Sequence, residues 1–287
     1  MIRERSIAII LLAAALAAVF ALVLISYFIF QAGLPTLIKI GLPGFIFNTV
    51  WEPTAKVPSF GILPMLIGSL WLTFGSLVIG VPLGLAVTIF MIDLAPAALA
   101  ALMKPAIQLL AGIPSVVYGF IGLTFLAPLV RRLLGGPGLS VLTAAIILGI
   151  MILPTIISIS GDAVRAVPRS LRDGALALGA TRWQMISQVV LPAARSGIIA
   201  SIILGMGRAL GETMAVIMMV GNSLNIPISP LDSATTLTSN IGLEMAYASG
   251  AHRDALFATG VILFLLIMLL NSITTAFVRR GTSRRTA

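Results

Sequence analysis

The chain has 287 residues, of which 59% are apolar and 9% are charged, and its mean hydropathy is +1.13. Because ordinary soluble domains carry about a quarter charged residues, this composition excludes a water-soluble globule and predicts an all-α polytopic membrane protein. The lack of cysteine and the single histidine exclude a disulfide framework, a thiolate metal site and a histidine cluster, and we expect no catalytic or metal site. The net charge of +9 indicates membrane topology first, and we expect no nucleic-acid partner.

Long stretches without charge mark the membrane spans. A helix needs about 20 apolar residues to cross about 30 Å of hydrocarbon, and five stretches between successive charged residues exceed that length. A sixth apolar stretch, between Arg195 and Asn222, is interrupted only by Arg208 and Glu212. We therefore predict six transmembrane helices, near 7–32, 65–92, 105–130, 140–161, 195–222 and 255–278.

The first predicted helix is too long for a cleavable signal peptide, whose apolar core has about 7–15 residues. We expect residues 1–33 to stay as an anchor and 34–64 to form a loop. A transmembrane domain at 65–278 then ends in a basic tail at 279–287. Within its first helix, Gly80 and Gly84 have the small-xxx-small spacing that lets two helices pack closely.

The distribution of basic residues predicts the orientation. Of the 18 lysines and arginines, 12 fall in one set of alternate loops, 5 fall in the other, and Arg208 lies within a predicted span. Because cytoplasmic loops are enriched in Lys and Arg, we expect both termini and the linker 162–194 to be cytoplasmic. The loop 34–64 and the loop 223–254 then face outward.

The linker between the fourth and fifth predicted helices has a pattern of its own. Leu171, Ala175, Leu178 and Met185 have helical spacing on the two sides of Gly179. We predict two short amphipathic helices joined by a glycine turn. Such a pair either docks another subunit or only lies on the lipid surface.

The chain has no nucleotide site of the P-loop type. Its three lysines, Lys39, Lys56 and Lys104, are followed by Ile, Val and Pro, so none belongs to the motif G-x-x-x-x-G-K-[ST]. A transporter built on this chain is therefore passive, coupled to an ion, or driven by a separate subunit.

Arg208 and Glu212 are the charged residues inside a predicted span. A lone charge there costs about 2.5–3.5 kcal/mol on insertion scales, and four residues of separation would place the two side chains on one helix face, where they can pair. One interpretation is that they only neutralise each other and lock the bundle. The other is that Arg208 grips an anion with its planar fork.

The linker resembles the "EAA" loop of importer-type, binding-protein-dependent ABC transporter permeases. Asp173-Gly174-Ala175, Gly179 and Val189-Val190-Leu191-Pro192 have the spacing of that loop, with Asp173, Gly174 and Val189 in place of the usual Glu, Ala and Ile. In that family the loop is a coupling helix that docks in a groove of a cytoplasmic ATPase. The resemblance implies a MetI-like permease fold and these coupling residues: Asp173, Gly174, Ala175, Gly179, Ala180, Leu191 and Pro192.

Five further stretches, in order along the chain, resemble the phosphate permeases of the PstC type. They are Trp51-Glu-Pro, Phe60-Gly-Ile-Leu-Pro64, Gly112-Ile-Pro-Ser-Val-Val-Tyr-Gly-Phe120, Arg208-Ala-Leu-Gly-Glu-Thr213 and Thr236-Leu-Thr-Ser-Asn-Ile-Gly-Leu-Glu244. The first two favour the PstC type over the PstA type. The resemblance implies a substrate pathway of Arg208, Glu212, Thr213, Ser115, Thr238, Ser239 and Asn240.

The resemblance also implies the partners. A PstC-type chain pairs in the inner membrane with a second permease of the PstA type. Two ATPase subunits bind ATP and Mg²⁺, so this chain needs no cofactor, and a periplasmic binding protein delivers phosphate to the outward loops.

Several alternatives stay open from the residues alone. The hydroxyls between Thr235 and Ser239 suit phosphate oxygens, but they equally suit a capped turn before a short helix. Arg208 would serve a sulfate or molybdate permease as well. An ion-coupled carrier would explain six spans and an intramembrane ion pair, but it would leave the coupling loop without a purpose. A structural or signalling membrane protein is a third alternative.

Overall fold

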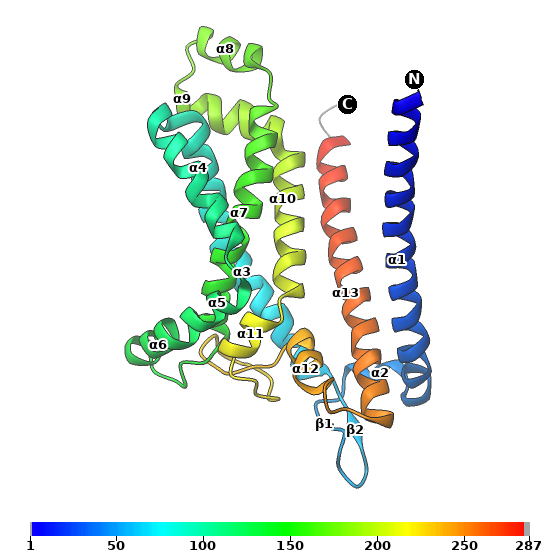
Figure 1. Cartoon of the computed structure of the whole chain (residues 1–287). Coiled ribbons are helices and arrows are strands. Elements are labelled where there is room, and N and C mark those ends of the chain that lie inside the picture. The colour runs from blue at the N-terminus through cyan, green and yellow to red at the C-terminus, as the bar shows by residue number, and fades with distance from the viewer. Residues whose placement is uncertain (1, 284–287) are drawn as a thin grey trace.

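The computed structural model describes residues 2–283, which form an elongated helical bundle with a small hairpin at one end (Figure 1). The N-terminus, the end of α13 and the short helix α8 lie at the same end, called here the α8 end; the hairpin lies at the opposite, hairpin end. From the N-terminus to the middle of the chain the elements are α1 (Ile2–Ile40), α2 (Leu42–Ile46), β1 (Trp51–Glu52), β2 (Ser59–Phe60), α3 (Leu63–Ile89), η1 (Phe90–Leu94), α4 (Ala97–Gly112), α5 (Ser115–Ile121), η2 (Gly122–Leu126) and α6 (Ala127–Leu134).

The second half of the chain begins with the long helix α7 and ends with the long helix α13. Its elements are α7 (Val141–Arg165), α8 (Arg169–Ala177), α9 (Arg182–Gln184), η3 (Met185–Val190), α10 (Leu191–Gly211), α11 (Met214–Met219), α12 (Leu237–Glu244) and α13 (Gly250–Ser283). Residues 284–287 of the predicted basic tail lie outside the described residues.

Six helical segments of the described residues are long and apolar enough to cross a membrane, which confirms the predicted number. They are Ile9–Ile40, Leu63–Leu94, Ser115–Leu134, Val141–Arg165, Arg182–Gly211 and Gly250–Thr275. The first helix runs to Ile40, into the predicted loop. The longer helices also carry charges that we predicted outside the spans, among them Asp93 at the end of the second.

Two predicted spans are wrong as continuous helices. The prediction 105–130 is broken because α4 ends at Gly112 and Ile113 is extended (φ −69°, ψ 126°), since the residue before a proline is disfavoured in the helical region. The prediction 195–222 is broken because α10 ends at Gly211. Apolar composition alone predicts neither break.

The α3–α7 pair forms the centre of the bundle. A Cβ built on Gly80 would lie 2.8 Å from the Gly149 carbonyl oxygen, and one built on Gly84 would lie 2.7 Å from Ile156 Cγ2. Nearer the α8 end, the buried hydroxyls of Thr88 and Ser160 lie 2.9 Å apart and form a hydrogen bond. The predicted close packing at the two glycines is therefore confirmed.

A polar cluster at the hairpin end fastens the hairpin to the bundle. The buried Trp51 indole N–H donates to both Glu244 carboxylate oxygens, at 3.1 and 3.0 Å. His252 Nε2 lies 2.6 Å from Glu244 Oε2. Partial burial raises the pKa of the neighbouring Tyr247 phenol above its ordinary value, and the Glu244 carboxylate raises it further. Glu244 thus joins strand β1 to the first turn of α13.

Gly80→Ala is expected to destabilise the protein by about 1–3 kcal/mol, the usual cost of overpacking a tight interior. The new Cβ would lie 2.7 Å from Ile152 Cδ1 and 2.8 Å from the Gly149 carbonyl oxygen, a backbone atom that cannot move aside. Gly260→Ala is the matched control, since its Cβ would meet only Ile29 Cγ2, at 3.7 Å. The measurement is the fraction of full-length protein that stays soluble after heating in mild detergent. Equal heat resistance of the two variants would contradict the packing described.

Glu244→Gln is expected to speed tryptic cleavage after Lys56, in the hairpin loop, by about tenfold or more. Hydrogen bonds to a charged group contribute about 1.5–3 kcal/mol to stability. The glutamine amide offers the Trp51 N–H one acceptor oxygen in place of the two of the carboxylate. Glu52→Gln is the control, because Glu52 is exposed and lies beside the same loop. Equal cleavage rates in the two variants would show that Glu244 does not hold the hairpin.

Candidate functional site

The site centres on the break where α10 ends. Gly211 is the last residue of α10, and Glu212 has an extended backbone (φ −70°, ψ 128°). Its Oε1 accepts a hydrogen bond from the Ala215 N–H at 3.2 Å, so Glu212 caps the short helix α11. Among the described residues Arg208 and Glu212 form no ion pair, and the predicted pairing on one helix face is wrong because Glu212 has left the helix.

Helix α12 supports the break from the side. The Thr238 hydroxyl donates to the Glu212 carbonyl oxygen at 3.0 Å. This bond satisfies a backbone acceptor that the broken helix leaves free, which the membrane interior requires. The side chain of Thr238 therefore stabilises the break itself.

The predicted hydroxyl cluster forms a capped turn. The Thr236 side chain accepts from the Ser239 N–H at 3.1 Å, and the Ser239 hydroxyl accepts from the Thr236 N–H at 2.9 Å. Residues 235–240 are buried, and the Asn240 side-chain nitrogen has no hydrogen-bond partner among the described residues. Of the two interpretations of this cluster, the structure contains the capped turn, and an anion would have to displace these internal bonds.

Arg208 lies in the last turn of α10, and its residue surface is exposed. Its guanidinium lies within electrostatic reach of Tyr118 in α5, whose hydroxyl donates to the Leu110 carbonyl oxygen at 2.9 Å. The Tyr118 bond crosses the break at Pro114. The two broken spans thus meet beside one exposed arginine.

Close packing holds these two spans together. A Cβ built on Gly119 would lie 3.0 Å from Ala215 Cα, and one built on Gly122 would lie 1.9 Å from Met219 Sδ. Helix α5 therefore packs on α11 at Gly119, and η2 packs on it at Gly122. Irregular backbone at membrane depth is tolerated where it is buried in protein or lines a cavity, and discontinuous helices of this kind commonly form transport sites.

The other predicted pathway residues lie at these breaks. Thr213 is the residue before α11, and its hydroxyl donates to the Gly211 carbonyl oxygen at 3.3 Å. Ser115 is the first residue of α5, and no hydrogen bond links it to the Arg208 group in the part of the chain that the structure describes. The structure thus gathers Arg208, Glu212, Thr213 and Thr238 at one break, with Ser239 and Asn240 following in α12.

The linker at the α8 end contains one separate helix, α8, and a glycine turn. Gly179 has φ +85°, a conformation in which glycine avoids the strain of a side chain. The second predicted helix is not separate, because α9 and η3 run directly into α10. Asp173 and Gly174 are exposed and Ala180 is half-buried, while Leu191 and Pro192 are the first residues of α10, directly after η3.

Part of the apolar surface of this linker is unpartnered in the single chain. Leu178 is 91% exposed and Trp183 is 62% exposed. Ala175 instead packs against the small cluster formed by Val164, Met185 and their buried neighbours. The predicted apolar face is therefore divided between the bundle and a free surface.

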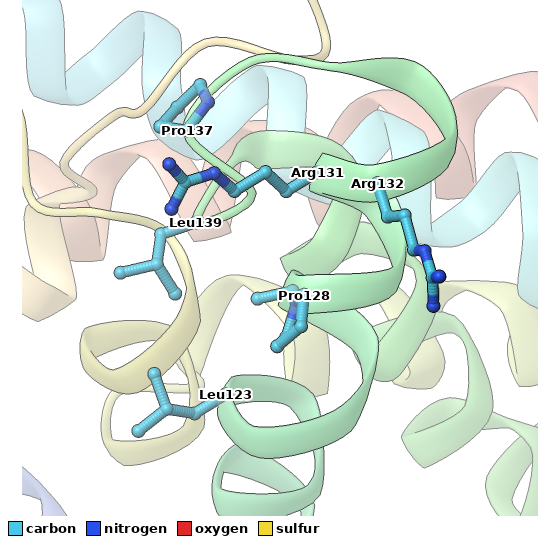
Figure 2. Close-up of a pocket in the computed structure, with 7 residues that line it drawn as sticks. Leu123, Pro128, Arg131, Arg132, Pro137 and Leu139 are labelled. Atoms are coloured by element: carbon cyan, nitrogen blue, oxygen red, sulfur yellow. The ribbon is translucent and has the colours of Figure 1, made fainter.

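A basic cavity of about 550 Å³ lies beside α6, at the hairpin end (Figure 2). Its lining includes Leu123, Pro128, Arg131, Arg132, Pro137 and Leu139. Figure 2 shows the Arg131 side chain extending toward Leu139 and the Arg132 side chain pointing away. Both arginines lie in the last turn of α6, where cations favour the negative end of the helix dipole. Sequence reasoning counted them only as loop charges.

Residues 80–283 match the family model described as "Binding-protein-dependent transport system inner membrane component". Curated relatives extend the likeness toward the N-terminus. The chain is 44% identical over 267 residues to the "Probable ABC transporter permease protein YqgH" of Bacillus subtilis (strain 168), which is 90% of this chain and 86% of the relative. It is 35% identical over 256 residues to the "Phosphate transport system permease protein PstC" of Pasteurella multocida (strain Pm70), which is 82% of this chain and 79% of the relative.

Solved structures share the fold. A chain of a bacterial alginate ABC transporter, solved with a periplasmic protein that holds an alginate pentasaccharide, has a TM-score of 0.64 at 18% identity and covers 93% of this chain and 95% of its own. A chain of the inward-facing MetNI methionine ABC transporter has a TM-score of 0.58 at 22% identity, and the match covers 77% of this chain and 94% of that one. The fold is therefore the MetI-like ABC permease fold that the coupling loop predicted. The chain is a multi-pass membrane protein that belongs to the family of binding-protein-dependent transport system inner membrane components.

Proposed function

We propose that this chain is one of two permease subunits of an ABC importer that carries inorganic phosphate across the inner membrane. The observation that carries the proposal is Arg208, an exposed arginine at the end of a broken span. The relatives that are named phosphate permeases support the choice of phosphate. ATP hydrolysis takes place on separate ATPase subunits.

The chemistry of the break suits a transient anion site. Arg208 offers a planar fork of N–H donors to phosphate oxygens, and Glu212 is occupied in capping α11. A translocated anion must leave as well as enter, so binding has to be weak enough for release. The nearby Glu212 carboxylate repels the anion and limits its residence. Thr213, Ser115, Thr238, Ser239 and Asn240 complete the proposed pathway.

The linker is the proposed contact with the ATPase. Leu178 and Trp183 present apolar surface, and the exposed Gly179 turn lets a partner approach the backbone closely. Asp173, Gly174, Ala175, Ala180, Leu191 and Pro192 belong to the same coupling loop, within 162–194. This assignment makes the α8 end, and with it both termini, cytoplasmic.

The remaining partners follow from that orientation. The hairpin end faces the periplasm, where the loops 34–64 and 223–254 receive a phosphate-binding protein. A second permease of the PstA type completes the channel, and two ATPase subunits bind ATP and Mg²⁺. The proposed division is an anchor at 1–33, a periplasmic loop at 34–64, a permease domain at 65–278 and a cytoplasmic tail at 279–287.

The rival cargo is another oxyanion, sulfate or molybdate, because Arg208 suits any of them. Vesicles that contain the assembled importer distinguish these cargoes directly. Uptake of labelled phosphate without uptake of labelled sulfate supports the proposal. Uptake of sulfate alone contradicts it.

Arg208→Gln is expected to lower phosphate uptake by at least about tenfold, because charge-assisted hydrogen bonds contribute about 1.5–3 kcal/mol. Arg208→Lys keeps the charge but loses the fork, so intermediate uptake is expected. Glu212→Gln should reduce uptake less, since Arg208 stays in place. Uptake into vesicles and assembly on a native gel are measured together. Normal uptake by Arg208→Gln refutes the anion site, and loss of its assembly indicates a structural arginine.

Gly179→Asp is expected to abolish uptake while the chain stays in the membrane, because a charged side chain at the turn holds the ATPase away. Gly250→Asp is the matched control for ATPase docking: Gly250 also has a positive φ, +54°, with no atom near a built Cβ, but begins α13 at the opposite end of the bundle. Pull-down of the ATPase measures docking. Retention of the ATPase by the Gly179 variant would contradict the coupling role.

A further inference from the structure

A part-buried ion pair joins α8 to the transmembrane bundle. Arg172, in the middle of α8, donates through Nη1 to Asp93 Oδ1 and through Nη2 to the Val164 carbonyl oxygen, the latter at 2.8 Å. The Asp93 side chain is 5% exposed and the Arg172 side chain is 16% exposed. Asp93 lies in η1, which ends the α3 span, and Val164 lies at the end of α7. One arginine therefore contacts two spans at once.

Few other contacts hold α8 in place. No residue of α8 is buried, and Leu171 and Leu176 are 48% and 42% exposed. Within α8, Ala175 packs against the neighbouring apolar cluster. The Arg172 contacts are thus the main polar attachment of α8 among the described residues.

The energetics favour a positioning role for this pair over a simple contribution to stability. Removing two charges from water costs free energy that their attraction repays only in good geometry, so a buried pair is weak evidence for stability. Asp93 Oδ2 is buried and has no hydrogen-bond partner among the described residues, so Arg172 is the group that compensates this carboxylate. The two N–H directions of the planar fork fix the angle of α8 as well as its position.

The spans that Arg172 contacts lead towards the anion site. Helix α3 packs along α7 at Gly80 and Gly84, and a Cβ on Gly205 of α10 would lie 3.3 Å from Ile156 Cγ1 of α7. Closely packed helices transmit displacement because interiors have low compressibility. Arg208 lies one turn beyond Gly205 on α10. A continuous packed path therefore runs from α8 through α3 and α7 to the break.

We propose that Asp93 and Arg172 are positioning residues that transmit movement of α8 to the spans, so that ATP hydrolysis is coupled to phosphate movement. This inference rests on the proposed function. It predicts that removal of the pair leaves the ATPase docked and active while transport fails. Loss of a merely structural contact would instead lower both activities together.

The test uses the complete importer in vesicles, with ATP hydrolysis and labelled phosphate uptake measured in one sample. Asp93→Asn and Arg172→Gln are expected to lower the phosphate moved per ATP by at least about threefold, within the range by which mutations along a coupling path act. Lys104→Gln is the matched control, because it removes an exposed charge in α4, outside the proposed coupling loop. That control should keep the wild-type ratio.

The outcomes separate this inference from the proposed function. If the wild-type complex moves no phosphate, the proposed function fails. If the wild type transports and both variants keep its ratio, the inference alone is wrong. A variant that does not assemble is replaced by Arg172→Lys, which keeps the charge but loses the fork and should give an intermediate ratio. Failure of all three variants to assemble would make the pair a folding element and overturn the inference.

Discussion

The break between α10 and α11 is the constraint on which the rest of the site depends. Backbone groups at membrane depth must find partners inside the protein, and here side chains supply them. The Thr238 hydroxyl donates to the Glu212 carbonyl oxygen, and the Glu212 carboxylate accepts from the Ala215 N–H. With these bonds in place the helix can end one residue before Glu212, which leaves Arg208 exposed in its last turn and free of an internal ion pair in the described chain.

A polar contact stabilises each of the two ends of the molecule. At the hairpin end, Glu244 ties β1 to α13 and so stabilises the surface that faces a delivery protein in our proposal. At the α8 end, Arg172 ties α8, the coupling helix in our proposal, to two spans. Between the two ends, the glycines of α3 allow the close helix contact that makes the bundle stiff enough to carry a displacement.

Sequence reasoning predicted the features that composition controls. Charge-free stretches predicted the number of spans because charges are costly in hydrocarbon. The glycine at 179 indicated a tight turn, and the structure has a positive φ there. The proline at 114 is a helix breaker visible in the sequence, but the span count treated 105–130 as continuous. The break at Glu212 was not predicted, since hydropathy reports side chains and not backbone geometry. The contacts Trp51–Glu244 and Asp93–Arg172 were not predicted because the partners lie far apart in the chain. A charge at a predicted span boundary, such as Asp93, and a polar residue within a motif, such as Glu244, were the available signals.

The most direct test of the account measures whether phosphate reaches the break. Gly211→Cys places a thiol on an exposed residue with no atom near its new Cβ, in a chain that has no other cysteine. In the assembled complex, a hydrophilic thiol reagent should modify this residue. The increase in the mass of this chain measures the extent of modification. Phosphate should slow that modification and sulfate should not. Modification at the same rate with and without phosphate, or no modification at all, would contradict an anion path at Arg208.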